Sequence, residues 1–180
     1  EVCYSGPKQN AERALAPIRK LGTPMSDGIK PQDYVRLQRV NDSSDNRSLG
    51  TYLKGGFISQ VPGKLVTTIV DEFRGDADRH TILFFQHCGG AAGRVAENAT
   101  AFAQRDAVAN MMAIAGWNMG AGDPAPHMQA TRAYWAKLEP FTRGFYVNDL
   151  AAKVTTKDIS SNYRGNLPRL RSVKKQYDPT

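Results

Sequence analysis

The chain has 180 residues, of which 41% are hydrophobic and 23% charged, and its formal net charge is +7. These values are typical of one folded domain, and they exclude a disordered chain or two domains of ordinary size. No apolar run approaches the roughly 18 residues of a membrane-spanning helix, and the first residues lack the pattern of a signal peptide. Because the chain starts at Glu1 rather than methionine, we read a cut end, and a cytoplasmic location is favoured without being fixed.

Cysteine and histidine are sparse in this sequence. Cys3 and Cys88 are too few for a disulfide framework, and His80, His87 and His127 are not spaced as zinc ligands usually are. No metal site is therefore expected.

Most of the positive charge lies towards the C-terminal end. Residues 153–180 contain seven basic and two acidic residues. Such a segment can bind nucleic acid, but more often it forms a solvated face or a surface that docks another domain. Only Tyr163 and Tyr177 supply aromatic rings there and no RNA-binding signature occurs, so nucleic-acid binding is the least favoured of these functions.

Two helices are predicted in the first forty residues. The segment "QNAERALAPIRKLG" has apolar residues at helical spacing, with Asn10 as the N-cap and Gly22 as the stop. The segment "KPQDYVRLQRV" predicts a second helix that starts near Pro31, with Tyr34 and Leu37 facing inward.

The middle of the chain predicts strands and one helix. "TYLKGGFISQ" (51–60) favours a strand that is interrupted by a bulge at its glycine pair. "PGKLVTTIVDEFRG" (62–75) favours a helix that ends at Gly75. "HTILFFQHC" (80–88) and "AVANMMAIAGW" (107–117) are strongly apolar and predict two further strands.

The last third of the chain predicts two helices and a short strand. A helix is expected over 123–141 with Asp123 as its cap, "GFYVNDL" (144–150) reads as a strand, and a final helix is expected over 166–179. The inner side of the first of these helices is expected to carry Met128, Thr131, Ala133, Tyr134, Trp135 and Leu138. The irregular alternation of elements predicts an α+β fold, with an antiparallel β-sheet and helices packed mainly on one face.

The segment "GGAAGRVAENATAFAQR" (89–105) is the densest glycine cluster in the chain. A phosphate-binding loop needs GxxxxGK[ST], and a dinucleotide site needs GxGxxG, and neither pattern is present. From the residues alone, a turn or bulge that joins two strands is therefore favoured over a phosphate site.

Several segments, taken in order, resemble the substrate-binding part of berberine-bridge-enzyme-like FAD-linked oxidoreductases, within the vanillyl-alcohol-oxidase group. They include "YLKGGF", "GGAAGRVAENATAFAQR", "ATRAYWAKLEPFTRGFYVND" and "NYRGNLPRLRSVKKQYDPT". The resemblance implies that residues 1–180 form a substrate-binding domain that is incomplete at both ends and lacks the FAD-binding domain. FAD would then be held mainly by that domain, in the same protein or in a partner chain, and an exposed cofactor-facing surface could also favour a homo-oligomer.

The chemistry implied by the resemblance is oxidation of a small-molecule substrate at a C–H bond next to oxygen or nitrogen. A base takes a proton, a hydride passes to the flavin and dioxygen reoxidises it, so the chain alone is expected to be inactive. The alternative is a standalone α+β binding or interaction module that uses no flavin.

The resemblance places catalytic and cofactor-binding candidates in "FYVND". As a strand, this segment would hold Tyr146 and Asn148 on one face. The resemblance makes Tyr146 a candidate catalytic residue and Asn148 a candidate for binding the cofactor. Some relatives have a tyrosine base after the asparagine, whereas this chain has Asp149. Asp149 could serve as base if burial raised its pKa, or it could face solvent at the end of the strand.

Tyr163 and Asn166 match a Tyr-Gly-x-Asn-Tyr element that lies near the flavin edge in the relatives. Here Arg164 replaces the first glycine and Leu167 the second tyrosine. Asn166 is expected either to bond the flavin or to cap the final helix.

In plant relatives a catalytic glutamate follows the glycine pair, and the matching position here is Arg94 or Gly93. A guanidinium cannot act as a base, so Arg94 would orient an anionic or carbonyl-bearing substrate, or simply pair on the surface. Gln86 and His87, just before the cluster, are substrate-binding candidates. Phe102 and Arg105 are expected to hold the sheet together rather than to take part in chemistry.

Overall fold

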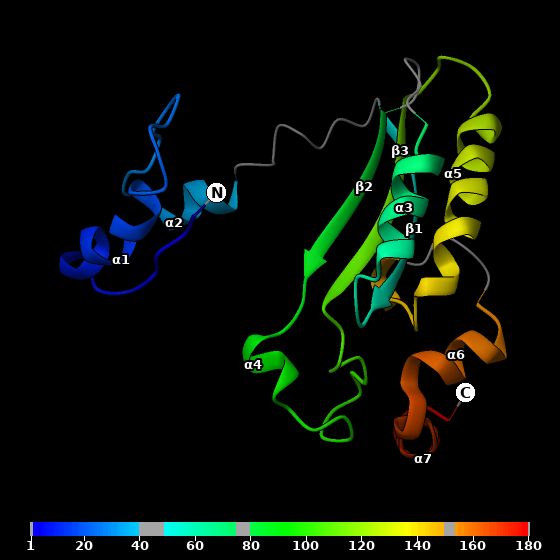
Figure 1. The fold of residues 1–180 in the computed structure, drawn as a ribbon. Coiled ribbons are helices and arrows are strands. Elements are labelled where there is room, and N and C mark those ends of the chain that lie inside the picture. Colours follow the sequence, from blue (N-terminus) through cyan, green and yellow to red (C-terminus); the bar gives the residue numbers. More distant parts are fainter. Residues whose placement is uncertain (1, 40–48, 75–79, 150–153, 180) are drawn as a thin grey trace. The chain divides into compact units, whose positions relative to one another are not determined.

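The computed structural model describes residues 2–39, 49–74, 80–149 and 154–179, with the side chain of Asp149 excepted. The chain divides into two compact units, residues 1–46 and 47–180, which are described separately (Figure 1). Gly75, which was expected to end a helix, lies outside the described residues, and so does Val40, the last residue of the segment "KPQDYVRLQRV".

The first unit consists of short helices: η1 (Lys8–Asn10), α1 (Ala11–Arg19) and α2 (Tyr34–Gln38). Asn10 is the N-cap residue of α1, as predicted, although its side chain makes no capping bond. Helix α2 begins later than predicted, because the Asp33 side chain accepts a hydrogen bond from the Arg36 N–H and fixes the start. The expected inward orientation of Tyr34 and Leu37 is wrong, because these side chains are 70% and 40% exposed.

The second unit is built on a three-stranded antiparallel sheet of order β1-β3-β2. Its strands are β1 (Leu49–Ile58), β2 (His80–His87) and β3 (Ala109–Asn118). Helices α3 (Gly63–Glu72) and α5 (Ala125–Leu138) lie together on one face of this sheet (Figure 1). The predicted α+β fold, with helices mainly on one face, is therefore confirmed.

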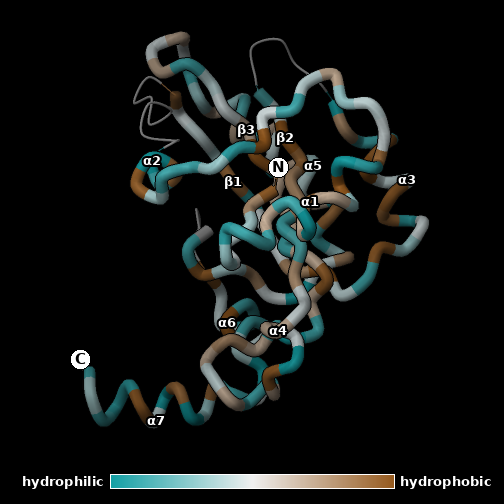
Figure 2. Tube along the Cα trace, turned by 90° about the vertical axis from the view of Figure 1, so that its left-hand side faces the viewer, coloured by the Kyte–Doolittle hydropathy of each residue, from teal (hydrophilic) through white to brown (hydrophobic). Residues whose placement is uncertain are grey.

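The remaining elements of the second unit lie outside this sheet and its two helices. They are α4 (Gly90–Gly93), η2 (Glu139–Phe141), η3 (Val147–Asp149), α6 (Thr156–Tyr163), η4 (Arg164–Asn166) and α7 (Leu167–Tyr177). Figure 2 shows hydrophilic and hydrophobic residues alternating along α7, whose residues are exposed or half-buried. Among the described residues, no helix combines the length and the apolar character that crossing a membrane would require.

The hydrophobic core lies between the sheet and the two covering helices. Alternate β3 residues point into it, together with one residue of β1, one of α3 and two of α5. This cluster consists of Ala109, Met111, Ala113, Ile58, Leu65, Trp135 and Leu138. Full burial of one aliphatic side chain stabilises the fold by about 1.5–3 kcal/mol, so the cluster fixes α5 and α3 against the sheet.

The buried side of α5 is narrower than predicted. Thr131, Trp135 and Leu138 are buried at helical spacing, and Met128 and Tyr134 are half-buried beside them. Ala133 is exposed, so its predicted inward position is wrong. It lies outside the stripe that the i, i+4 and i+7 spacing of the buried residues defines.

The glycine pair of β1 forms no bulge. Gly55 pairs with Met112 and Gly56 with Met111 in unbroken register. A Cβ atom on Gly56 would lie 2.9 Å from the Thr142 Cβ and 3.1 Å from the Gly144 carbonyl oxygen. The glycine is therefore needed because another segment passes close to the strand.

The segment 144–150 is not a strand in its described part, which corrects the prediction. The Arg143 N–H donates to the Phe57 carbonyl at 2.7 Å in an isolated bridge, and the chain then turns at Gly144 with φ of 61°. The 3-10 helix η3 follows. This segment contains aromatic and β-branched residues, which favour a strand. The turn at Gly144 nevertheless determines its path.

Candidate functional site

A cavity of about 350 Å³ opens at the end of the sheet where β2 gives way to the glycine cluster. Gln86 and His87 line it from β2, and Phe57 lines it from β1. Gly89 and Gly93 line it from the glycine cluster. The cavity therefore lies at the junction of the regular sheet and the irregular chain that follows it.

The glycines allow the chain to turn sharply and pack closely here. Gly89 and Gly90 have φ of 136° and 58°, which glycine adopts far more readily than other residues. A Cβ on Gly93 would lie 3.3 Å from the Arg105 carbonyl oxygen. The prediction of a glycine-rich turn between two strands is confirmed, with the short helix α4 inside it.

Aromatic side chains form one wall of the cavity. The rings of Phe57 and Phe102 meet edge to face with centroids 5.5 Å apart. Tyr146 also lines the cavity and is 41% exposed. Its phenol oxygen accepts a hydrogen bond from Asn148 Nδ2 at 2.7 Å, so the phenolic hydrogen remains available to bond a ligand.

Arg105 fastens the glycine cluster to the loop that follows. Its Nη1 donates to the Ala92 carbonyl at 3.0 Å and its Nη2 to Thr100 Oγ1 at 2.6 Å. Its Nε donates to the Phe102 carbonyl at 3.1 Å. Arg105 therefore has a structural role, as expected, but it joins two loop segments and not two strands of the sheet. Phe102 does contact the sheet, through the ring of Phe57.

A group of polar side chains, Gln104, Asn162, Arg164 and Asn166, extends from the cavity, which Gln104 itself lines, and we call this group the polar hub. Arg164 contacts Gln104 Oε1 at 2.6 Å, Asp106 at 2.9 Å and Glu97 at 3.1 Å. Burial acts to lower the pKa of Arg164, but the carboxylates of Asp106 and Glu97 outweigh it and raise that pKa above its ordinary value. Arg164 is therefore firmly charged.

The amides of the polar hub bond to the backbone. Gln104 Nε2 donates to the Asn162 carbonyl at 2.9 Å, and Asn162 Oδ1 accepts from the Phe145 N–H at 2.9 Å. Asn166 Nδ2 donates to the carbonyls of Glu97 and Thr100. Asn166 is the N-cap residue of α7, which is one of its two predicted roles, although its side chain makes no capping bond.

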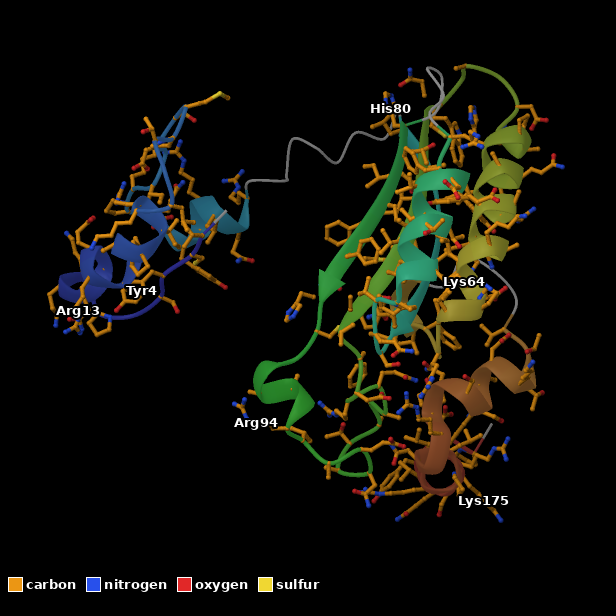
Figure 3. The ribbon with its side chains drawn as sticks, viewed as in Figure 1. Tyr4, Arg13, Lys64, His80, Arg94 and Lys175 are labelled. Carbon is orange, nitrogen blue, oxygen red and sulfur yellow. The ribbon has the colours of Figure 1, made fainter. Side chains whose placement is uncertain are left out.

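The predicted site residues do not all meet. Gln86, His87 and Tyr146 line one cavity, and Asn148 touches Tyr146. Arg94 is exposed at the outer side of α4 and is not among the residues that line the cavity (Figure 3). The side chain of Asp149 lies outside the described part of the chain, so its assignment as base stays a prediction.

The cofactor-binding predictions for Tyr163 and Asn166 also remain predictions. Tyr163 is half-buried at the end of α6, and both described bonds of Asn166 Nδ2 go to the loop. Sequence reasoning missed the polar hub itself. One signal was available, because Arg164 replaces a glycine of the resembled element and its backbone indeed has a positive φ of 47°.

Comparison with known proteins supports the resemblance. No profile of a known protein family matches the chain. The chain is 28% identical over 179 residues to the uncharacterized FAD-linked oxidoreductase YgaK of Bacillus subtilis, covering 98% of this chain and 39% of that protein. The chain thus spans about two fifths of the length of this curated relative.

Solved structures share the fold over nearly the whole chain. Aclacinomycin oxidoreductase superimposes with a TM-score of 0.69 at 22% identity, covering 97% of this chain and 40% of that protein. The BBE-like protein 28 of Arabidopsis thaliana gives a TM-score of 0.67 at 20% identity, covering 98% and 43%. The sequence resemblance to FAD-linked oxidoreductases is therefore confirmed, and the fold is shared with a BBE-like protein.

Proposed function

We propose that the chain is the substrate-binding part of an FAD-dependent oxidoreductase that oxidises a C–H bond next to oxygen or nitrogen. The observation that carries the proposal is the cavity that joins Gln86, His87 and Tyr146 on a fold shared with FAD-linked oxidoreductases. Bound FAD would accept a hydride from the substrate, and dioxygen would then take up the two electrons. The chain alone would be inactive.

The residues present suit the flavin ring but not the rest of FAD. The face of the sheet opposite α3 and α5 carries Ile82, Phe84, Met112 and Ile114 in adjacent register positions, and the first two are 52% and 47% exposed. Such an apolar face fits a planar aromatic ring. The glycine cluster, with the four-residue helix α4, lacks both phosphate-binding patterns, so a domain outside this chain would hold the pyrophosphate.

The side chains of the cavity can handle the substrate and its proton. His87, as a neutral imidazole, can accept a proton, and Tyr146 can bond a substrate hydroxyl or amine. Asp149 remains a further candidate for the base. Asn148, Tyr163 and Asn166 remain the candidates for bonds to FAD.

The substrate-orienting role expected for Arg94 is better placed on Arg105. Arg105 lines the cavity, and its partners within the described part of the chain are two carbonyls and a hydroxyl. Its positive charge therefore meets no carboxylate there, and it suits an anionic or carbonyl-bearing group of the substrate.

Co-expression with the FAD-binding domain of the longer protein tests the proposal. We expect a yellow complex with visible flavin absorbance. Phe84→Lys, on the sheet face opposite α3 and α5, should prevent assembly, whereas Val70→Lys, which is 69% exposed on α3, should leave it intact. A colourless complex, or loss of assembly with both variants alike, would contradict the proposal and favour a standalone binding module.

A further inference from the structure

One guanidinium holds both ends of the cavity wall. The wall is the irregular segment 97–106, from which Phe102, Gln104 and Arg105 line the cavity. Arg164 bonds to Glu97 at one end of the segment, to Asp106 at the other, and to Gln104 between them. The side chain of Arg164 is 21% exposed, so these bonds are partly shielded from water.

The wall has little regular structure of its own. Its described backbone bonds are local turns, such as those from Arg105 N–H to the Ala103 carbonyl and from Ala107 N–H to the Gln104 carbonyl. No strand ladder or helix holds it in the described structure. Its order therefore comes from side-chain contacts, which include the packing of Phe102 on Phe57, the bonds of Asn166 and the ion pair of Arg143 with Asp106. Among these contacts, those of Arg164 reach both ends of the wall.

The backbone of Arg164 shows that the side chain matters at this position. Its φ of 47° and ψ of −129° belong to a region that glycine favours, and Arg164 is the one non-glycine residue with positive φ among the described residues. Gly165 follows directly, yet arginine stands at the unfavourable position. The fork of the guanidinium, which can serve several acceptors at once, offsets this backbone cost.

We infer that Arg164 is a positioning residue, which fixes the cavity wall and thereby sets the shape of the cavity. It couples the segment α6–α7 to the wall, so that the C-terminal helices serve as the scaffold of the site. This inference goes beyond the proposed function, because it concerns how the cavity is built and holds for any ligand.

Cys88 provides a local probe, because it lines the cavity and is half-buried. In a Cys3→Ser background of the 180-residue chain, the rate at which a thiol reagent labels Cys88 reports how open the wall is. We expect Arg164→Ala to raise that rate several-fold and to speed amide hydrogen exchange in residues 97–106 but not in β3.

Arg132→Ala is the matched control. Arg132 also makes a partly buried side-chain bond, to Tyr52 Oη at 2.9 Å, but it lies on α5 and does not line the cavity. We expect it to leave Cys88 labelling and exchange in 97–106 at parental rates. Equal acceleration by both variants would show a general loss of stability and overturn the inference.

Two milder variants keep the test decisive if Arg164→Ala folds poorly. Arg164→Gly relieves the backbone, so it should be more stable than Arg164→Ala yet label Cys88 as fast. Arg164→Lys keeps the positive charge but lacks the fork, so labelling should stay faster than parental. Parental labelling and exchange rates in these variants would overturn the inference.

Discussion

At the scale of single residues, buried polar groups decide how the cavity is held. Gly144 turns the chain beside the polar hub, where a Cβ atom would lie 2.3 Å from Gln104 Nε2 and 2.9 Å from Asn162 Oδ1. Its φ of 61° adds a second reason for glycine. The hub therefore tolerates no side chain at this turn.

We expect Gly144→Ala to destabilise the fold by roughly 1–3 kcal/mol from backbone strain, with a further loss from the displaced Gln104 bond. Gly63→Ala is the control, because it starts α3 with no atom near the added Cβ. Urea denaturation measures both. Equal stability of the two variants would contradict this account of the turn.

Tyr134 is a second residue whose environment predicts behaviour. Burial raises the pKa of its phenol, and the phenol oxygen is buried without a partner among the described residues. The pKa of Tyr134 is higher in the folded than in the unfolded chain. The stability that its neutral phenol contributes is therefore complete below about pH 10, and it is lost as the pH rises through the folded pKa.

Tyr134→Phe should therefore retain or increase stability at neutral pH, because it removes a buried hydroxyl that gains no bond. It should also reduce the loss of stability at alkaline pH. Thermal unfolding at pH 7 and above pH 10 measures both effects. A large loss at pH 7 would show that the hydroxyl has a partner that this account does not include.

At the scale of elements, α6 depends on a reciprocal cap. The Asp158 N–H donates to Thr155 Oγ1 at 3.2 Å, and Asp158 Oδ2 accepts from the Thr155 N–H at 2.9 Å. Two hydrogen bonds lower the pKa of Asp158 below its ordinary value. The larger effect comes from the Thr155 side chain and the smaller from the Thr155 backbone N–H. This helix start matters because α6 leads into the polar hub.

Thr155→Ala should lower the free energy of unfolding by about 1 kcal/mol at neutral pH, because the helix loses its capping bond.

The pKa of Asp158 is lower in the folded than in the unfolded chain. The stability that its carboxylate contributes is therefore present above the unfolded pKa of about 3.9, and it is lost as the pH falls through the folded pKa. Asp158→Asn should therefore flatten the acid side of the stability profile. An unchanged profile, compared with exposed Ser160→Ala, would contradict the cap.

Elements with a strong hydrophobic period were predictable from sequence, and those fixed by distant polar contacts were not. The strands β2 and β3 and the helices α3 and α5 follow their apolar patterns. The segment 144–150 was mispredicted, because Gly144 and the bond of Asn162 to Phe145 set its path. The bonds between the polar hub and the segment 97–106 join residues 57 to 69 positions apart, and no local pattern indicates such bonds.

At the scale of the whole molecule, the second unit covers the two faces of its sheet unequally. Helices α3 and α5 cover the first, whereas Ile82 and Phe84 remain exposed on the second. An exposed apolar face next to a cavity is typical of a surface that meets a ligand or another domain. The proposed partner, an FAD-binding domain, would place the flavin ring against this face and beside His87 and Tyr146.

Anaerobic bleaching of the flavin absorbance tests the central claim most directly. The assembled yellow complex would be mixed with a panel of alcohols, sugars and amines, and the parent compared with His87→Ala, Tyr146→Phe and the control Arg132→Ala. We predict that at least one compound bleaches the parent and the control, and that one or both cavity variants bleach at least tenfold more slowly while keeping their flavin. Bleaching at the parental rate in both cavity variants would contradict the claim that this cavity binds the substrate.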